Sequence, residues 1–219
     1  MSRIHSFCLA AGLIALAGCS GALNRALPAA MFGANARPDS GMKRATNLIV
    51  NGSFEKPTAP SGSYLSFNKG DTFTGWTVSG ASGSIAIVGK NFSYGGYKIG
   101  AGCGDQLVDL TGSSDTKTGV KQRVATTPSA SYTLSFQVGN AWAASGNIGK
   151  TSTVLVYLNG RKWFSATNKK GKGVLHEVWQ TFSKSFVAKS KRTTIEFLNG
   201  DPVTDTDNGL DCVSLVPAN

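Results

Sequence analysis

The residues of this chain that could carry out covalent or metal chemistry are few and widely spaced. Its 219 residues include four cysteines and only two histidines, His5 and His176. A zinc site of three histidines is therefore excluded, and a serine or cysteine nucleophile would depend on one of these imidazoles. Glycoside hydrolysis needs only two carboxyl groups across the bond, but no recognisable catalytic motif singles out any of the twelve Asp and Glu residues. The pattern argues against an enzyme and leaves a glycan hydrolase as a less favoured alternative.

The N-terminus predicts export from the cell. Arg3 precedes an apolar run over residues 7–17, and small residues come just before Cys19. A positive start, a short apolar segment and a small-residue cleavage position are typical of a secretory signal, which is too short to remain as a membrane span. We expect residues 1–18 to be a signal peptide that is removed, and His5 leaves with it.

Residues 16–19, Leu-Ala-Gly-Cys, resemble the lipobox of bacterial lipoproteins. The resemblance implies that Cys19 receives a diacylglycerol and becomes the first residue of the mature protein. Several acyl chains hold a protein to a bilayer better than one, so the membrane is an expected partner. Ser20, which is neither acidic nor bulky, implies sorting to the outer membrane of the bacterial cell envelope. The alternative is an ordinary signal peptide that is cut nearby and leaves the protein soluble.

Two cysteines remain for other roles once Cys8 leaves with the signal and Cys19 carries lipid. They are Cys103 and Cys212. Because an envelope compartment is oxidising, a remaining pair is most simply a disulfide. A reactive thiol is the less favoured interpretation.

The chain divides into three predicted parts. After the signal peptide, residues 19–46 form a lipidated N-terminus and a flexible tether rich in Ala, Gly and Pro. Residues 47–219 form one domain, in which short apolar runs alternate with turn residues such as Asn-Gly. Regularly spaced short strands of this kind are typical of an all-β sandwich or barrel.

The clearest predicted strand covers residues 132–138. Its apolar residues alternate with polar ones, so that one set should face the core. Residues 47–54 are predicted as a further strand. The core-facing set consists of Tyr132, Leu134, Phe136 and Val138.

Four segments, taken in order, resemble one family. They are residues 47–55 (NLIVNGSFE), residues 73–89 with FTGWTV and GSIAIVG, residues 104–110 (GDQLVDL) and residues 210–215 (LDCVSL). Together they are similar to the bacterial choice-of-anchor C proteins and to plant cell-wall proteins that share a domain of unknown function. The resemblance covers about residues 47–216. It implies a galactose-binding-like jelly-roll β-sandwich, the architecture of many carbohydrate-binding modules.

The same resemblance implies a structural calcium ion where the first and last strands meet. The residues that match its protein ligands are Glu55 and Asp211. Calcium takes six to eight oxygen ligands, including backbone carbonyls. The alternative is that the two carboxylates only accept hydrogen bonds from backbone donors at the strand ends.

Exposed aromatic rings are the side chains on which the apolar faces of sugars stack. Trp142 lies in a loop rich in Gly, Ala and Ser, and Trp163 lies in a basic segment, residues 161–172, that departs from the family pattern and is expected to be a loop. These are the first candidates for a glycan site, and Tyr94 and Tyr97, within a Gly-rich stretch, are weaker ones. The alternative for both tryptophans is partial burial beneath a loop.

The chain carries a formal net charge of +10, and its basic residues concentrate between positions 150 and 192. Such a bias favours anionic partners such as acidic polysaccharide, although it is more often only a solvated face. No specific nucleic acid is expected. The sequence therefore predicts a surface-anchored, noncatalytic carbohydrate-binding or adhesion module whose partner is a glycan, including an anionic one. A structural envelope or matrix protein that binds another protein is the alternative.

Overall fold

The computed structural model describes residues 46–113, 117–142, 148–205 and 207–218. All regular elements in these ranges are strands, and no helix there could cross a membrane. Cys19, the predicted signal peptide and the tether up to residue 45 lie outside the described residues. In chain order the strands are β1 (Tyr64–Asn68), β2 (Thr72–Phe73), β3 (Trp76–Gly80), β4 (Ser84–Val88), β5 (Phe92–Tyr94), β6 (Tyr97–Ile99), β7 (Leu107–Asp109), β8 (Thr118–Ala125), β9 (Ser131–Asn140), β10 (Ser152–Leu158), β11 (Arg161–Asn168), β12 (Val178–Val187), β13 (Arg192–Asn199) and β14 (Gly209–Pro217).

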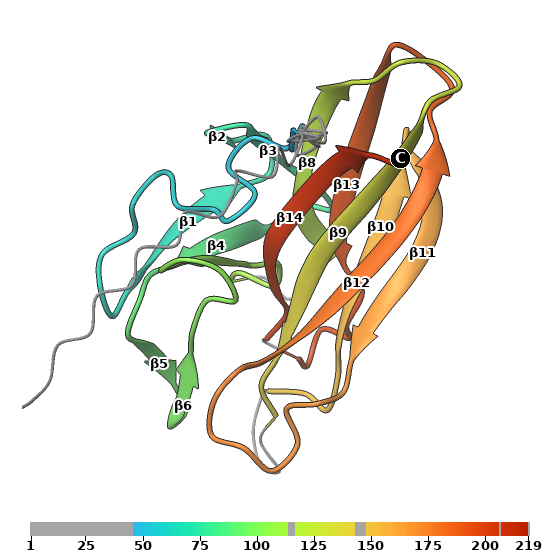
Figure 1. Ribbon diagram of the computed structural model, residues 1–219. Coiled ribbons are helices and arrows are strands. Elements are labelled where there is room, and N and C mark those ends of the chain that lie inside the picture. The colour runs from blue at the N-terminus through green and yellow to red at the C-terminus, as the bar shows by residue number, and fades with distance from the viewer. Residues whose placement is uncertain (1–45, 114–116, 143–147, 206, 219) are drawn as a thin grey trace, which may run out of the picture. The chain divides into compact units, whose positions relative to one another are not determined.

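The strands form two antiparallel sheets that pack face to face (Figure 1). The first, which we call sheet A, has the order β1-β4-β7-β14-β9-β12, and the second, sheet B, has the order β11-β10-β13-β8-β3-β2. A separate hairpin pairs β5 with β6. The predicted all-β jelly-roll sandwich is confirmed.

The core between the sheets follows from the alternation of side chains along the strands. On β9, Leu134, Phe136 and Val138 are fully buried, as the sequence pattern predicts. The ring of Phe136 packs edge-to-face on Phe197 of β13 at 5.0 Å between centroids, which joins the two sheets. Buried aromatic pairs of this geometry contribute about 0.5–1.5 kcal/mol beyond their area.

Two local predictions were wrong. Residues 47–54 are not a strand, because Asn51 and Phe54 both have φ of 54°, which an extended strand does not contain. Conversely, residues 161–168 are strand β11 rather than a loop. Asn159 and Gly160 adopt positive φ values of 50° and 79°, the conformation of a two-residue hairpin turn that pairs the flanking strands tightly.

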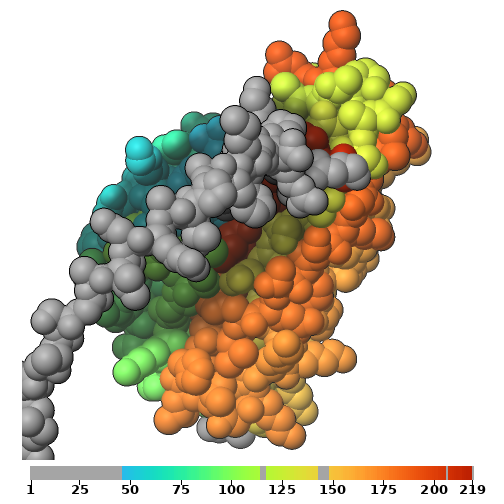
Figure 2. Space-filling model, viewed as in Figure 1, coloured from blue at the N-terminus to red at the C-terminus, as the bar shows by residue number. Residues whose placement is uncertain are grey.

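The outer face of sheet A, which points away from this core, carries a second and smaller apolar cluster. Alternation places Ala86 and Val88 of β4 and Leu107 of β7 on this face, and Ile99 at the end of the β5–β6 hairpin packs on them. The hairpin is held by the backbone of the segment before β12, since the N–H of Glu177 donates to the carbonyl of Lys98 at 2.9 Å. In the space-filling view, the green hairpin lies against the orange residues that precede β12 (Figure 2).

Candidate functional site

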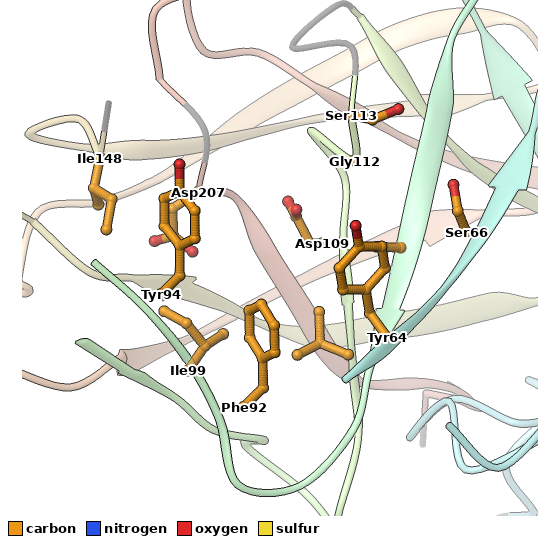
Figure 3. Close-up of a pocket in the computed structure, with 12 residues that line it drawn as sticks. Tyr64, Ser66, Phe92, Tyr94, Ile99, Asp109, Gly112, Ser113, Ile148 and Asp207 are labelled. Atoms are coloured by element: carbon orange, nitrogen blue, oxygen red, sulfur yellow. The ribbon is translucent and has the colours of Figure 1, made fainter. Parts of the chain in front are cut away.

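A cavity of about 260 Å³ opens beside the second apolar cluster, on the outer face of sheet A. Strands β1, β4 and β7 supply one side, and the β5–β6 hairpin supplies another (Figure 3). Concave sites of this kind, mostly apolar with a few polar groups, are where small ligands bind. The lining residues are Tyr64, Ser66, Ala86, Val88, Phe92, Tyr94, Ile99, Asp109, Gly112, Ser113, Ile148 and Asp207.

Three aromatic rings border this cavity. Tyr64 of β1 and Tyr94 of β5 are about half exposed, at 51 % and 49 %. Phe92 also lines the cavity and packs edge-to-face on Tyr64, with 5.9 Å between the ring centroids. The turn after Tyr94 consists of Gly95 and Gly96, both with positive φ. Aromatic rings that remain exposed at a cavity can stack on a ligand without first being uncovered.

Two carboxyl groups point into the same space. Asp109 ends β7, and its Oδ1 accepts hydrogen bonds from the backbone N–H of Thr111 at 2.9 Å and from the hydroxyl of Thr111 at 2.7 Å. Burial raises the pKa of Asp109 to about 6, and the bonds from Thr111 oppose that rise. The carboxyl group is therefore poised to change its charge near neutral pH.

Asp207 lies just before β14 and is buried. Its Oδ2 accepts a hydrogen bond from the backbone N–H of Ala141 at 2.7 Å. Burial is the main reason that its pKa is well above the ordinary value, and the negative charges of Asp109 and Asp205 add to the effect. Two carboxyl groups at one apolar cavity therefore resist being ionised together.

Glu177 lies next to this pair, on the same face of sheet A. One row of paired residues crosses the sheet from Asp109 to Gly209 and on to Gly139, which puts all three on one face. The carboxyl group of Glu177 rests on the two glycines, where a Cβ would overlap it. Burial, together with the charges of Asp207 and Asp109, raises its pKa well above the ordinary value. No hydrogen bond of ordinary length reaches either carboxyl oxygen from the described residues, and the nearby backbone N–H of Gly100 opposes only part of the rise in pKa.

The structure brings only one of the four predicted glycan-binding residues to the exposed rim of this cavity. That residue is Tyr94. Tyr97 is half-buried and packs on the second apolar cluster. Trp142 is half-buried with Lys172 Nζ 5.5 Å from its ring centroid, and it does not line the cavity.

Trp163 has a packing role at the edge of the core. It lies on β11 and makes edge-to-face contacts with Phe164 at 4.9 Å and Phe186 at 5.6 Å. Lys184 Nζ lies 5.0 Å from its ring centroid. Trp163 is therefore partly buried, which is the alternative that the sequence left open.

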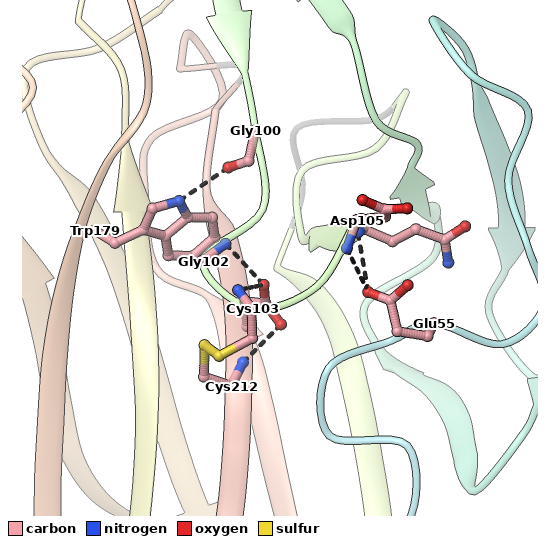
Figure 4. Close-up of a disulfide and its surroundings, with 9 residues drawn as sticks. Glu55, Gly100, Gly102, Cys103, Asp105, Trp179 and Cys212 are labelled. Atoms are coloured by element: carbon pink, nitrogen blue, oxygen red, sulfur yellow. Dashed lines mark hydrogen bonds between the residues drawn. A yellow bond between two sulfur atoms is a disulfide. The ribbon is translucent and has the colours of Figure 1, made fainter.

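The predicted disulfide is present and joins the segment before β7 to β14 (Figure 4). Cys103 and Cys212 have their Cα atoms 5.5 Å apart, well within the normal range. Close by, the indole N–H of Trp179 donates to the carbonyl of Gly100 at 2.9 Å. The segment over residues 100–106 is thereby held against the outer face of sheet A.

The two predicted calcium ligands hold the same segment through its backbone N–H groups (Figure 4). Oε1 of Glu55 accepts from Asp105 at 2.9 Å and from Gln106 at 3.0 Å. Oδ2 of Asp211 accepts from Gly102 and Cys103, at 2.9 and 2.8 Å. In the described residues no group of three or more His, Cys, Asp or Glu is arranged to hold a metal ion. The pair suits the alternative role, as acceptors for backbone donors, and calcium stays a prediction.

Sequence reasoning did not place Tyr64, Phe92, Asp109, Asp207 or Glu177 at a glycan site. The strongest available signal was Asp109, a carboxylate within the apolar run Leu107–Leu110. Its place at the end of a short strand beside a hairpin could not be read from the pattern. Glu177 carried no signal, because its environment comes from two glycines on other strands.

Solved structures of low sequence identity are similar to this chain. A cyclase from Fischerella sp. TAU, solved with 4-(1H-indol-3-yl)butan-2-one, is similar with a TM-score of 0.52 at 16% identity, over 80% of this chain and 100% of that chain. A family 61 carbohydrate-binding module solved with β-1,4-galactotriose has a TM-score of 0.47 at 17% identity, over 80% of this chain and 100% of that one. A family 35 carbohydrate-binding module from Clostridium thermocellum has a TM-score of 0.44 at 14% identity, over 71% and 99%.

No curated protein matches the chain. A family model does match, over residues 47–214, and its description is a protein of unknown function, DUF642. The match covers nearly all of the sandwich and contains the segments 47–55 and 104–110 on which the resemblance was based. The chain therefore belongs to the DUF642 family.

Proposed function

We propose that the chain is a noncatalytic carbohydrate-binding module displayed at the bacterial cell envelope, and that the cavity on sheet A is its glycan site. The observation that carries the proposal is the combination of Tyr64, Phe92 and Tyr94 with the carboxyl groups of Asp109 and Asp207 at one cavity. Sugars present apolar ring faces that stack on aromatic side chains, and hydroxyl groups that hydrogen-bond to carboxyl oxygens. A volume of about 260 Å³ suits one or two sugar units rather than a long polysaccharide groove.

The direct test is glycan binding by the chain and by two sets of variants. Tyr94→Ala and Tyr64→Ala remove exposed rings at the cavity and should weaken binding at least about tenfold, since stacked rings contribute on the order of 1–2 kcal/mol. Trp163→Ala is the matched control, because that ring packs elsewhere on β11. Full affinity in both tyrosine variants, with binding lost in Trp163→Ala, would move the glycan site to the tryptophan that the sequence favoured.

The attachment of the domain is a separate part of the proposal. We infer that Cys19 carries a lipid that holds the protein in the outer membrane, as in the bacterial lipoproteins whose lipobox residues 16–19 resemble. The support is the lipobox-like tetrapeptide that precedes Cys19. Mass spectrometry of the mature protein should find an acylated N-terminal cysteine, and Cys19→Ser should release the protein from the membrane fraction. An unmodified Cys19 in the mature protein would overturn this part and leave the glycan site untouched.

A glycan hydrolase is the second candidate, and one observation favours it. Asp109 and Asp207 lie at the same cavity, and hydrolysis of a glycoside uses two carboxyl groups, one of which is held protonated. Incubation with bound oligosaccharides should release no reducing sugar if the module is noncatalytic. Release that Asp109→Asn abolishes would identify an enzyme instead. Reproducible capture of an envelope protein with no glycan binding would favour the structural alternative.

A further inference from the structure

We propose that the cavity selects a sugar that carries an unacetylated primary amino group, as in oligosaccharides of glucosamine. The inference rests on the proposed glycan site and names the class of sugar that it takes. It is based on the charge around the cavity, on the position of Glu177 and on the aromatic rings at the rim.

Any charge that the described lining of the cavity carries is negative. Of the twelve lining residues, the two that carry charge are Asp109 and Asp207, and none is Lys, Arg or His. Between described residues, the ion pair found within 4 Å joins Lys90 and Asp105, both well exposed and outside the cavity lining. Buried carboxylates are normally paired or hydrogen-bonded, because an unpaired charge in an apolar environment is costly. Asp109 and Asp207 accept hydrogen bonds, but the described lining brings no cation to them, and a cation supplied by the ligand would favour their ionised forms.

Glu177 is the second and independent observation. It is 6 % exposed, and from the described residues its carboxyl oxygens receive no hydrogen bond of ordinary length, although the backbone N–H of Gly100 lies near enough to oppose part of the rise in its pKa. The carboxyl group rests on Gly209 and Gly139, in the same row as Asp109. Buried polar atoms almost always find a partner. Asp109 and Asp207 line the cavity, and Glu177, which does not line it, adds a third carboxyl group on the same face of sheet A. Together they favour a ligand that brings hydrogen-bond donors.

A primary ammonium group matches this environment better than a hydroxyl group does. It offers three N–H donors and a full positive charge, and a charged hydrogen bond is about twice as strong as a neutral one. The exposed rings of Tyr64 and Tyr94 can also attract a cation through their faces. An acidic sugar would meet like charge at Asp109 and Asp207, so the basic residues elsewhere on the chain do not make this cavity a site for anionic glycans.

The test compares three oligosaccharides of equal length by calorimetry: one of glucosamine, one of N-acetylglucosamine and one of glucose. We expect the glucosamine oligosaccharide to bind about tenfold or more tightly than either of the others, because one charged hydrogen bond accounts for such a ratio. Nonspecific attraction cannot produce this result, since the chain has a net charge of +10 and repels a polycation.

Variants show which carboxyl groups cause the preference for the glucosamine oligosaccharide. Asp109→Asn and Glu177→Gln keep the shape of the side chains. The first changes a residue that lines the cavity and should reduce the preference for glucosamine about tenfold, and the second changes a residue next to the lining and should reduce it less. Glu196→Gln is the matched control, because that carboxylate lies on β13 of sheet B beside Lys121. Thermal unfolding of each variant checks that the fold is retained.

The outcomes separate the two proposals. Equal or tighter binding of the N-acetylated or glucose oligosaccharide, with affinity that still depends on Tyr94, overturns the amino-sugar inference and leaves the glycan site standing. A preference for glucosamine that persists in both Asp109→Asn and Glu177→Gln also overturns it. If none of the three binds, or if Tyr94→Ala has no effect on any of them, the cavity is not a glycan site and both proposals fail.

Discussion

The carboxyl group of Glu177 lies directly against Gly139, so that a Cβ on that glycine would overlap Oε1 of Glu177. The missing side chain thus provides the space in which a buried carboxyl group rests on sheet A. We predict that Gly139→Ala forces Glu177 out of this position and lowers the free energy of unfolding by about 1–3 kcal/mol, as overpacking usually does. Chemical denaturation measures the change.

Gly100→Ala is the matched control for this prediction, because a Cβ there meets no atom within 4 Å. It should leave the free energy of unfolding within about 0.5 kcal/mol of the parent, as most exposed substitutions do. Equal stability of the two variants would show that Glu177 moves aside without cost.

The disulfide should contribute a large part of the stability of the domain. Cys103 and Cys212 are separated by 109 residues in sequence, and a cross-link that closes a loop of this length stabilises by about 4–5 kcal/mol in the chain-entropy model. We predict that Cys103→Ser with Cys212→Ser lowers the free energy of unfolding by about that amount. Thiol titration of the denatured, unreduced protein should find neither cysteine free, and two reactive thiols would contradict the bond.

The sandwich could be predicted because its signals are local. Alternation along residues 132–138 places Leu134 and Phe136 in the core, and the pair Asn159-Gly160 marks the turn after β10. The same signals misled at residues 47–54, where an apolar run is bound beside β14 by single hydrogen bonds, such as Leu48 N–H to the carbonyl of Leu215 at 2.8 Å. An apolar run alone does not indicate that Asn51 adopts a positive φ, which a strand does not contain.

The candidate site could be predicted only in part, because non-local pairing creates it. Tyr94 was a candidate from its Gly-rich surroundings, but Asp109 reaches the cavity through pairing of β7 with β4 and β14. Trp163 looked exposed because the hairpin that makes β11 was not recognised. Residues brought together from distant strands leave no spacing in the sequence by which they could be found.

The buried carboxyl groups predict an unusual dependence of stability on pH. Burial raises the pKa of Asp109 from 3.8 to about 6 and that of Asp211 to about 7. The native state therefore binds more protons than the unfolded state between about pH 4 and pH 7, so stability falls as pH rises through this window. For Asp109 and Asp211 the loss is complete above this window. Asp207 and Glu177, whose pKa values are also raised, act in the same direction.

Asp109→Asn isolates one contribution to this profile. The variant should be more stable than the parent at pH 8 by about 3 kcal/mol, since each unit of pKa shift corresponds to about 1.4 kcal/mol and burial raises the pKa of Asp109 from 3.8 to about 6, and the difference should become small near pH 4. The exposed charges on neighbouring segments, Lys98 and His176, are unchanged in both proteins. Denaturation curves at several pH values provide the measurement, and a variant that loses stability at pH 8 would contradict the assigned role of burial.

A substitution at Glu55 tests whether this carboxylate binds calcium or only accepts hydrogen bonds from the backbone. Its Oε1 accepts from the N–H groups of Asp105 and Gln106, and an amide in its place would accept these bonds without the charge. We predict that Glu55→Gln lowers the free energy of unfolding by about 1–2 kcal/mol, equally in calcium and in chelator, because charged hydrogen bonds are stronger than neutral ones. If calcium instead raises the melting temperature of the parent and Glu55→Gln abolishes that rise, the ion is bound where the family resemblance puts it, and the bonds to the backbone are secondary.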